Sequence, residues 1–447
     1  MQRKWYVSVL LVSVLLWGCG SESITEPSAS TEYEGLEGND IINVVRRQDG
    51  NLATFRVSTS SSLDMVTTTD QGDLVSVHTI DVKPGGSINK IVSLNDGASF
   101  LYMSGFGYAV FDGGGSVMAS ATWWDILDLS HWQPNSSNVV TYLGSNDQGF
   151  CVKRRVNAEH YDAHCLDFNG NLVWQLMPSQ SVERIDGDLG QDGIVYLRTV
   201  EGEQSWLRAY TLSGSVLWER QTDDLPGENY NSNSLQWVNE KLLLIKYVKD
   251  EEDVTTQYFI HLNLDGSFHS VAEVATDNQL FYIQPYDANS YVALVRVPAY
   301  GMRLFRVNLN GEVLWVRNLP GRQLFIAFEG QQHPMRIDAQ GNIVVIGSEQ
   351  VMTPSLLVYP LKVALRYYFT RFNGNGSKLD EHLVGRYRYR IVSDVNPTVA
   401  VETGFAPNEF IVFDGGYVTA GIDTFYIAES NPDQTYTPPL TINYYSW

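Results

Sequence analysis

Cysteine and histidine are the residues of this chain best suited to chemistry, and four of them lie close together in the sequence. Cys151 and Cys165 flank a polar turn centred on Ala158, so a symmetric hairpin there makes the two cysteines cross-strand neighbours. In an oxidising compartment such a pair forms a disulfide, and two free buried thiols are the alternative. His160 and His164 lie nearby at strand spacing, but no further metal ligand is evident. We therefore expect a disulfide and no metal.

Signatures of familiar reaction classes are absent from the sequence. The chain has no haem attachment motif, no vicinal cysteine pair, no nucleophile elbow, no phosphate-binding loop and no zinc protease motif. The segment starting at Asp188 resembles a calcium loop, since Gly193 falls at its sixth position. Its twelfth position, however, is Thr199, where a bidentate carboxylate is needed, and a Gly-rich turn explains the residues as well. We expect no cofactor, and catalysis by residues that converge in the fold stays open.

The N-terminus has the pattern of a targeting segment. Residues 1–4 are a short basic start, and an uncharged, mostly apolar run follows from Trp5 to Leu16. This run is too short to span a bilayer comfortably, which favours a signal peptide over a permanent anchor.

The end of this run, Leu16 to Cys19, resembles the lipobox of bacterial lipoproteins, which is an apolar residue, a small residue, Gly or Ala, and then Cys. Leu16, Gly18 and Cys19 fit the pattern, and Trp17 departs from it at a tolerant position. The resemblance implies that residues 1–18 are removed and that Cys19 carries acyl chains, which anchor a protein firmly when several are present. No Asp follows the Cys, which implies the outer membrane, facing the periplasm or the cell surface. An ordinary secretory signal with a chance Cys is the alternative.

The composition is that of a globular and strongly acidic chain. Its 447 residues are 44% apolar and 12% aromatic, with 37 Gly, which excludes a disordered chain, a coiled coil and a polytopic membrane protein. Acidic residues outnumber basic ones 51 to 30, giving a net charge of −21. This argues against nucleic acid as a partner, because binding it requires Lys and Arg to neutralise phosphates. Residues 19–40 are expected to be the lipidated Cys and a flexible tether, and residues 41–447 one domain.

An internal repeat of roughly 50 residues fills this domain. One recurring phrase is an alternating apolar strand, an Asn-, Asp- or Ser-Gly turn, and a short strand ending in Trp, as at Trp174, Trp218 and Trp315. Such turns supply the positive φ of a two-residue hairpin. A second turn class, a Gly or polar residue that opens an apolar strand, precedes each copy. Its eight marks are Gly50, Gly97, Gly149, Gly193, Glu240, Ser290, Gly341 and Gly415. We expect the first class to join the first two strands of each unit and the second class the last two.

Four-stranded units at this spacing are typical of a β-propeller. The phrase resembles the repeat of the PQQ-like propeller family, although Asn, Asp or Ser replaces the Thr of that family's Thr-Gly turn. The resemblance covers residues 40–447 and implies an all-β propeller of four-stranded antiparallel blades, eight being favoured and seven being the alternative. The quinone dehydrogenases of that family need a calcium, a catalytic carboxylate and a quinone pocket. These residues cannot be placed here, so the cofactor does not carry over.

The last unit lacks a strand. Only two strands fit after its turn mark, within Tyr417–Ser430 and Thr435–Trp447. Closure of the ring then needs a fourth strand from the N-terminal side, within residues 31–39.

The topology of a propeller places both Gly-tipped turn classes at one end of the ring and the remaining connections at the other end. Those remaining connections hold the insertions, so the second end is the expected binding face. The insertions are Met118–Asn138, Arg220–Ser234, Tyr247–Thr256, Ser348–Lys362 and Asp380–Glu409.

Two of these insertions carry apolar candidates for partner binding. In the first, Trp123, Trp124 and Trp132 are interface anchors or a platform for sugar stacking if exposed. The alternative is that Trp123 and Trp124 straddle a blade, one on each face. In the other, the segment 351–360 has no charge and contains Leu356, Leu357 and Tyr359. An apolar hairpin tip is unfavourable unless something covers it, so we expect partner docking, with packing onto the ring as the alternative.

A third insertion carries alternating basic and aromatic residues, Gly385–Arg390. The period of two places Arg386, Arg388 and Arg390 on one face of a strand. These arginines are candidates for binding an acidic partner or lipid headgroups. Pairing with the protein's own surplus carboxylates is the alternative.

The sequence therefore predicts a non-enzymatic propeller lipoprotein of the outer membrane that presents its loop-rich face to a protein partner. Its lipobox, its eight units and its lack of a quinone site resemble the propeller lipoproteins of the outer-membrane β-barrel assembly machine. A glycan-binding or glycan-processing propeller is the second hypothesis, and it predicts paired carboxylates about 5–9 Å apart at the mouth of the channel. A PQQ-dependent redox enzyme is the third.

Overall fold

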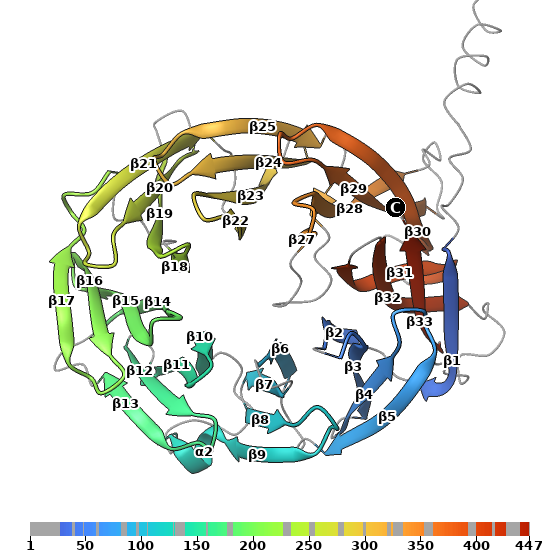
Figure 1. Cartoon of the computed structure of the whole chain (residues 1–447), viewed down its shortest axis with the longest axis horizontal. Coiled ribbons are helices and arrows are strands. Elements are labelled where there is room, and N and C mark those ends of the chain that lie inside the picture. The colour runs from blue at the N-terminus through green and yellow to red at the C-terminus, as the bar shows by residue number, and fades with distance from the viewer. Residues whose placement is uncertain are drawn as a thin grey trace, which may run out of the picture.

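The computed structural model is a ring of β-sheet blades around a central channel (Figure 1). It describes residues 27–446 except the stretches 38–40, 48, 60–61, 82–86, 95–97, 105, 128, 130–138, 158–159, 177–181, 227–233, 250–254, 276–280, 298–300, 320–322, 325–333, 353–360, 392–398, 414–415 and 426–438.

Six blades are separate four-stranded antiparallel sheets in which spatial order follows sequence order. In each, the first strand lines the channel and the fourth forms the outer rim (Figure 1). Blades 1 to 3 consist of β2 (Ile41–Arg46), β3 (Leu52–Thr59), β4 (Ser62–Thr68), β5 (Leu74–Asp81); β6 (Ser87–Ser93), β7 (Ser99–Ser104), β8 (Gly107–Phe111), β9 (Val117–Thr122); and β10 (Val140–Asn146), β11 (Gly149–Arg155), β12 (Tyr161–Asp167), β13 (Leu172–Leu176). Blades 4 to 6 consist of β14 (Arg184–Leu189), β15 (Ile194–Glu201), β16 (Gln204–Thr211), β17 (Val216–Gln221); β18 (Ser234–Val238), β19 (Lys241–Lys249), β20 (Thr255–Leu262), β21 (Phe268–Ala275); and β22 (Phe281–Asp287), β23 (Ser290–Val297), β24 (Gly301–Asn308), β25 (Val313–Leu319).

Blades 7 and 8 are joined edge to edge in one nine-stranded sheet. Blade 7 begins with two short inner strands that both pair with the same neighbour, and blade 8 ends with the first strand of the chain. The prediction of eight four-stranded blades is confirmed. The strands are β26 (Gln323–Leu324), β27 (Met335–Ile337), β28 (Ile343–Met352), β29 (Leu361–Phe372), β30 (Lys378–Ile391), β31 (Val399–Phe413), β32 (Gly416–Phe425), β33 (Pro439–Ser446) and β1 (Ala29–Glu37).

Strand β1 closes the ring. It pairs antiparallel with β33, from Ala29 opposite Tyr444 to Glu37 opposite Pro439, so it is the outer strand of blade 8 (Figure 1). The expected N-terminal closing strand is therefore present, and the domain starts at Ala29 rather than at residue 41. The segment 29–37 belongs to the propeller and not to the tether, since its backbone completes the last sheet.

The two turn classes lie at one end of the ring but join other strands than expected. The Asn-Gly class joins the third strand to the fourth, as at Gly170 between β12 and β13, where φ is +85°. The second class joins the first strand to the second, as at Gly193 between β14 and β15. The expected unit was thus shifted by two strands, because each blade starts after a long connection. We call the end with both turn classes the short-turn end and the opposite end the loop end.

Contacts between a Trp and a Gly explain why these residues recur in one phrase. Trp218 on β17 packs against the turn of the next blade, where a Cβ on Gly266 would lie 2.7 Å from the indole ring. The Trp218 Nε1 donates to the Leu264 carbonyl at 2.6 Å. Trp315 packs in the same way against Gly376 and donates to the Gly374 carbonyl at 2.9 Å. Each copy of the phrase therefore joins its blade to the following one.

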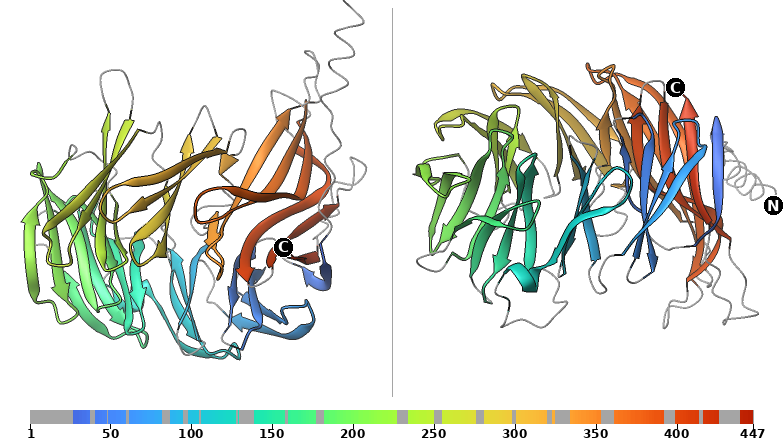
Figure 2. Two further views of the ribbon diagram at one scale, coloured as in Figure 1. Left: turned by 45° about the horizontal axis from the view of Figure 1, so that its top comes forward. Right: turned by 60° about the horizontal axis from the view of Figure 1, so that its bottom comes forward.

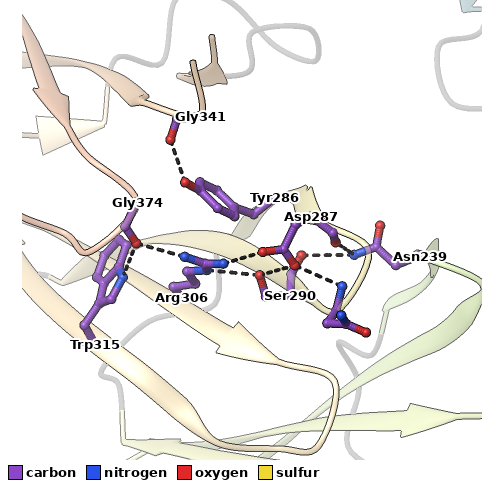
Figure 3. A network of polar contacts seen from close by, with 9 residues as sticks. Asn239, Tyr286, Asp287, Ser290, Arg306, Trp315, Gly341 and Gly374 are labelled. Atoms are coloured by element: carbon purple, nitrogen blue, oxygen red, sulfur yellow. Dashed lines mark hydrogen bonds and ion pairs between the residues drawn. The ribbon is translucent and has the colours of Figure 1, made fainter. Parts of the chain in front are cut away.

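A polar network reinforces the short-turn end between blades 5, 6 and 7 (Figure 3). The Arg306 guanidinium lies 3.8 Å from the ring centroid of Tyr286, 2.5 Å from the Asp287 carboxylate and 2.9 Å from the Gly374 carbonyl. The Asn239 side chain donates to the Asp287 carbonyl at 2.8 Å. Because one arginine contacts two blades, this end of the ring is held by side chains as well as by its turns.

Apolar side chains fill the space between neighbouring blades, and the disulfide lies in one such core. Cys151 on β11 and Cys165 on β12 are directly opposite in register and form a disulfide bond. Both are buried in a cluster with Trp174 of the same blade and Val195 and Leu197 of the next. The disulfide thus links the two central strands of blade 3 beneath that interface.

Candidate functional site

The tryptophans of the first insertion do not form an exposed pair. They belong to α2 (Trp123–Ile126), a single turn capped by Thr122 and Asp125. Trp123 is completely buried, and its Nε1 donates to the Met103 carbonyl at 3.0 Å. It is therefore a core residue and no partner anchor, because one turn of helix directs it under the blade. Trp124 is partly buried against the same cluster. Within the described ranges, no helix has the length and apolarity of a membrane span.

Other predicted residues lie outside the described ranges or are described by their backbone. The lipid-anchor candidate Cys19, the third tryptophan, Trp132, and the apolar loop residues Leu356, Leu357 and Tyr359 lie outside the described residues. The arginines Arg386, Arg388 and Arg390 lie on β30.

Blades 7 and 8 reach beyond the rest of the ring at the loop end. Strands β28 to β31 have 10 to 15 residues, whereas the strands of blades 1 to 6 have five to nine. The inner strands β26 and β27 pair with β28 only as far as Ser348. We call the part beyond, residues 349–352, 361–366, 386–391 and 399–403, the sheet extension; the long strands of blade 7 are orange in Figure 2.

The register of the sheet extension brings basic positions together. Arg386 is opposite Arg366, and Arg390 is opposite Lys362. Residues directly opposite in an antiparallel pair share a face, and so do alternate residues of one strand. Five basic positions, with Arg388 between the other two of β30, therefore share one face. Arg366 also lies 3.9 Å from a carboxylate of the neighbouring strand, Glu349.

A cavity of 630 Å³ opens on the channel wall, lined by the inner strands of blades 2 to 6 and by Lys153 of β11. Its size is in the range of small-molecule sites. Its walls carry both charges, several aromatic rings and apolar side chains. The lining residues used below are Lys90, Tyr142, Gly144, Ser145, Lys153, Asp186, Asp188, Leu235, Trp237, Tyr282 and Ile283.

Asp188 lines this cavity with a carboxyl group whose pKa is altered by burial. Burial raises its pKa to about 6, against the opposing effects of hydrogen bonds from the backbone N–H groups of Trp237 and Leu189 and of the nearby Lys90 charge. These bonds measure 3.0 Å and 2.9 Å. A side chain on Gly144 would collide with this carboxylate, so the glycine beside the bulge of β10 makes room for it. A carboxyl group with a pKa near neutrality is suited to proton transfer or to binding a cation.

Lys90 faces the same cavity from blade 2. Its Nζ lies 4.2 Å from the ring centroid of Tyr142, whose hydroxyl donates to Ser145 at 2.6 Å. Burial lowers the pKa of Lys90, and the carboxylate of Asp188 acts in the opposite direction. Among the described residues no ion pair or hydrogen bond to this ammonium group is found, so it remains available to a ligand.

The second carboxylate of the cavity is already engaged. Asp186 lies two residues before Asp188 on β14, 3.4 Å from Lys153 Nζ and 3.6 Å from the Arg198 guanidinium. Lys153 also donates to the Ile185 carbonyl at 2.9 Å. The segment that resembled a calcium loop begins at Asp188, which lies on the channel strand β14.

The described residues contain no metal-binding group of three or more His, Cys, Asp or Glu side chains. His164 lies 3.0 Å from Asp162, which Arg154 also contacts. Burial acts to raise the pKa of Asp162, but the hydrogen bonds from His164 and Arg154 outweigh it and lower that pKa. His160 contacts Asn157 within its own turn.

A second recess, of 540 Å³, lies at the outer rim between blades 4 and 5. Its arginine, Arg220, donates to the Gly266 carbonyl at 2.8 Å and lies 2.5 Å from Asp224. Because its cation is engaged by the chain itself, this recess is a weaker candidate than the channel cavity.

Comparisons with known proteins carry no assignment of activity or partner. No family model and no curated protein matches the sequence. A structure of a Bacteroides caccae protein of unknown function matches at 9% identity and a TM-score of 0.34, over 72% of this chain and 90% of that one. An uncharacterised Listeria monocytogenes protein matches at 11% and 0.41, over 70% and 91%. A virginiamycin B lyase from Staphylococcus aureus matches at 9% and 0.36, over 93% and 98%.

Proposed function

We propose that this protein is an outer-membrane-anchored, non-enzymatic propeller lipoprotein that binds an acidic protein partner through its loop end. The lipobox resemblance of Leu16 to Cys19 supports the anchor. The likeness of the repeat to the PQQ-like family, without that family's quinone site, supports a scaffold. The single observation that carries the proposal is the basic face of the sheet extension.

The position of β1 supports an orientation in which the loop end faces away from the membrane. Ala29 is opposite Tyr444, close to Ser446 at the end of β33, and Ser446 is opposite Gly416 at the start of β32. That end of blade 8 is the short-turn end. A lipid on Cys19 would therefore hold the short-turn end toward the membrane and leave the loop end facing away from it.

The charge of the chain supports an acidic partner over lipid headgroups. The protein carries a net charge of −21, yet five basic positions share one face of the sheet extension. Arg386 opposite Arg366 is a like-charged cross-strand pair, and Glu349, whose carboxylate lies 3.9 Å from Arg366, is opposite that arginine on β28. Because this face is at the end remote from the anchor, we infer a protein that bears carboxylates.

The anchor has a direct test. Cys19→Ser removes the acylated thiol, so we expect the protein to move from the membrane fraction to the soluble fraction on cell fractionation. Ser21→Ala, which leaves the cysteine in place, is the matched control and should stay with membranes. Retention of the Cys19→Ser protein in the membrane fraction would contradict the lipoprotein assignment.

The partner surface is tested by two charge reversals on one strand. Arg388→Glu changes the loop end of β30, and Lys378→Glu changes its short-turn end, where the lysine lies 3.0 Å from Glu381. In affinity capture from detergent-solubilised envelopes, we expect Arg388→Glu to reduce the captured partner roughly tenfold or more, because like charges then face each other.

The control, Lys378→Glu, should capture the partner as wild type does. Capture by wild type should also fall as ionic strength rises, since exposed charges are screened. If both variants capture the partner as well as wild type does, and capture by wild type does not depend on ionic strength, the basic face is not the docking surface.

A glycan-processing propeller is the second candidate, and one observation favours it. Two carboxylates, Asp186 and Asp188, line one cavity, and the pKa of Asp188 is raised by burial to about 6. Glycoside hydrolysis uses a carboxyl pair in which one member is kept protonated near neutral pH. The disaccharide comparison described below decides between this candidate and a cavity built for charged ligands.

A further inference from the structure

The channel cavity contains an ammonium group and a carboxyl group that are not bonded to each other. Lys90 comes from blade 2 and Asp188 from blade 4, and no ion pair joins them, although each affects the other's charge. The other charged pair of the cavity differs, because Lys153 and Asp186 lie 3.4 Å apart. Among the described residues, Lys90 and Asp188 are therefore the charged groups of the cavity that form no ion pair, although Asp188 accepts two backbone hydrogen bonds.

We propose that this cavity binds a small zwitterion, an amino acid or a short peptide, with its carboxylate at Lys90 and its ammonium group at Asp188. The cavity is on the channel wall and not on the sheet extension, so the proposal goes beyond the partner-binding function and does not depend on it. An uncharged ligand would leave both groups without a counter-charge, which is unfavourable at a site withdrawn from water.

The remaining walls fit such a ligand. Leu235 and Ile283 offer apolar surface for its side chain, and the rings of Tyr142 and Tyr282 border the same space. The Nε1 of Trp237 is buried and has no hydrogen-bond acceptor among the described residues.

The electrostatics of the two groups agree with this assignment. Burial lowers the pKa of Lys90 and raises the pKa of Asp188, so the charged form of each is disfavoured in the protein alone. A ligand carboxylate beside Lys90 and a ligand ammonium beside Asp188 would favour both charged forms.

The experiment is isothermal titration calorimetry of the full chain with alanyl-alanine, its N-acetyl derivative, its C-terminal amide and the uncharged disaccharide maltose. We expect alanyl-alanine to bind. Each modification removes one ligand charge and should weaken binding roughly tenfold or more, the range of a charge-assisted hydrogen bond. Maltose should not bind at millimolar concentration.

Protein variants assign each charge to its partner. In Lys90→Met, the peptide acid and its amide should bind equally; in Asp188→Asn, the free amine and its N-acetyl derivative should bind equally. Lys241→Met removes a lysine that contacts Asn263 at 2.8 Å and is not among the cavity residues, so it should behave as wild type.

Three outcomes overturn the proposal. These are no binding of alanyl-alanine at millimolar concentration, equal binding of the three peptide forms by wild type, and binding of maltose in their place. The last would favour the glycan candidate. The ligand comparisons need only wild-type protein, so the proposal can be tested even if a variant fails to fold.

Discussion

Deletion of residues 29–37 is expected to lower the free energy of unfolding by about 6 kcal/mol, at roughly 1 kcal/mol for each of the six register pairs between β1 and β33. The deletion leaves β33 as an open edge in blade 8 and removes the strand pairing through which the N-terminal segment joins the C-terminal blade. An open edge can pair with other chains, so aggregation should accompany the loss of stability. Thermal unfolding followed by circular dichroism and light scattering measures both effects.

A matched control separates closure of the ring from loss of any N-terminal sequence. Deletion of residues 20–27 shortens the tether by nearly the same length and leaves β1 in place, so its melting temperature should equal that of wild type. A synthetic peptide of residues 29–37, added to the truncated protein, should restore part of the stability because it can pair with β33 in trans. If both deletions melt alike, β1 does not close the ring.

The closing strand also marks what sequence patterns can and cannot find. The eight turn marks are local signals, because a Gly or polar residue at each turn opens an apolar strand, and at Gly50, Gly193 and Gly341 the glycine has the positive φ that it adopts readily. Their spacing was enough to predict eight blades. Strand β1 has no comparable signal, since its sequence from Ala29 to Glu37 is largely polar. Its presence followed only from counting the strands that the last blade lacked.

The channel cavity was not predicted, although the repeat contained a signal for it. Its residues come from five blades and lie about 50 positions apart in the chain, so no short motif contains them. Side chains alternate between the two faces of a strand. The residues five and seven positions before each mark of the second turn class therefore lie on the same face of the inner strand. The fifth residues before five successive marks all line the cavity: Val92, Gly144, Asp188, Leu235 and Pro285. The seventh residues that line it are Lys90, Tyr142, Asp186 and Ile283.

The tryptophan pair is the opposite case, a site predicted from the sequence that the structure places in the core. Adjacent aromatic residues in a long connection indicate an exposed platform when the connection is irregular. Here Thr122 caps a single helical turn, and that turn carries Trp123 into the core, where Met103 accepts its indole hydrogen bond. Whether Trp123 lies at the surface or in the core depends on one hydrogen-bonded turn, and the length of the insertion does not indicate that turn.

We expect the free energy of unfolding of wild type to fall relative to that of Asp188→Asn as pH rises from 4 to 7. The expected fall is about 3 kcal/mol, for a shift of roughly two pKa units in Asp188. Its folded pKa is raised to about 6 by burial, above the value of about 3.9 in an unfolded chain. The sign follows directly, because a raised pKa contributes stability that is fully present below about pH 4 and is lost as pH rises through about 6. Lys90, Lys153 and Asp186 are the other charged groups of this cavity.

Chemical denaturation of both proteins at several pH values measures this difference, since changes shared by the two cancel. Asp287→Asn is the control with opposite sign. Burial acts to raise the pKa of Asp287, but hydrogen bonds from Ser290 and Asn289 and the charge of Arg306 lower it overall, so wild type should gain on that variant as pH rises through the acid range. If the Asp188 difference is flat with pH, the carboxyl group is ionised without penalty and the cavity is as wet as bulk solvent. If the stability of wild type falls relative to Asp188→Asn as expected, the channel holds a carboxyl group whose proton a ligand cation can displace at neutral pH. The proposed zwitterion site requires this property.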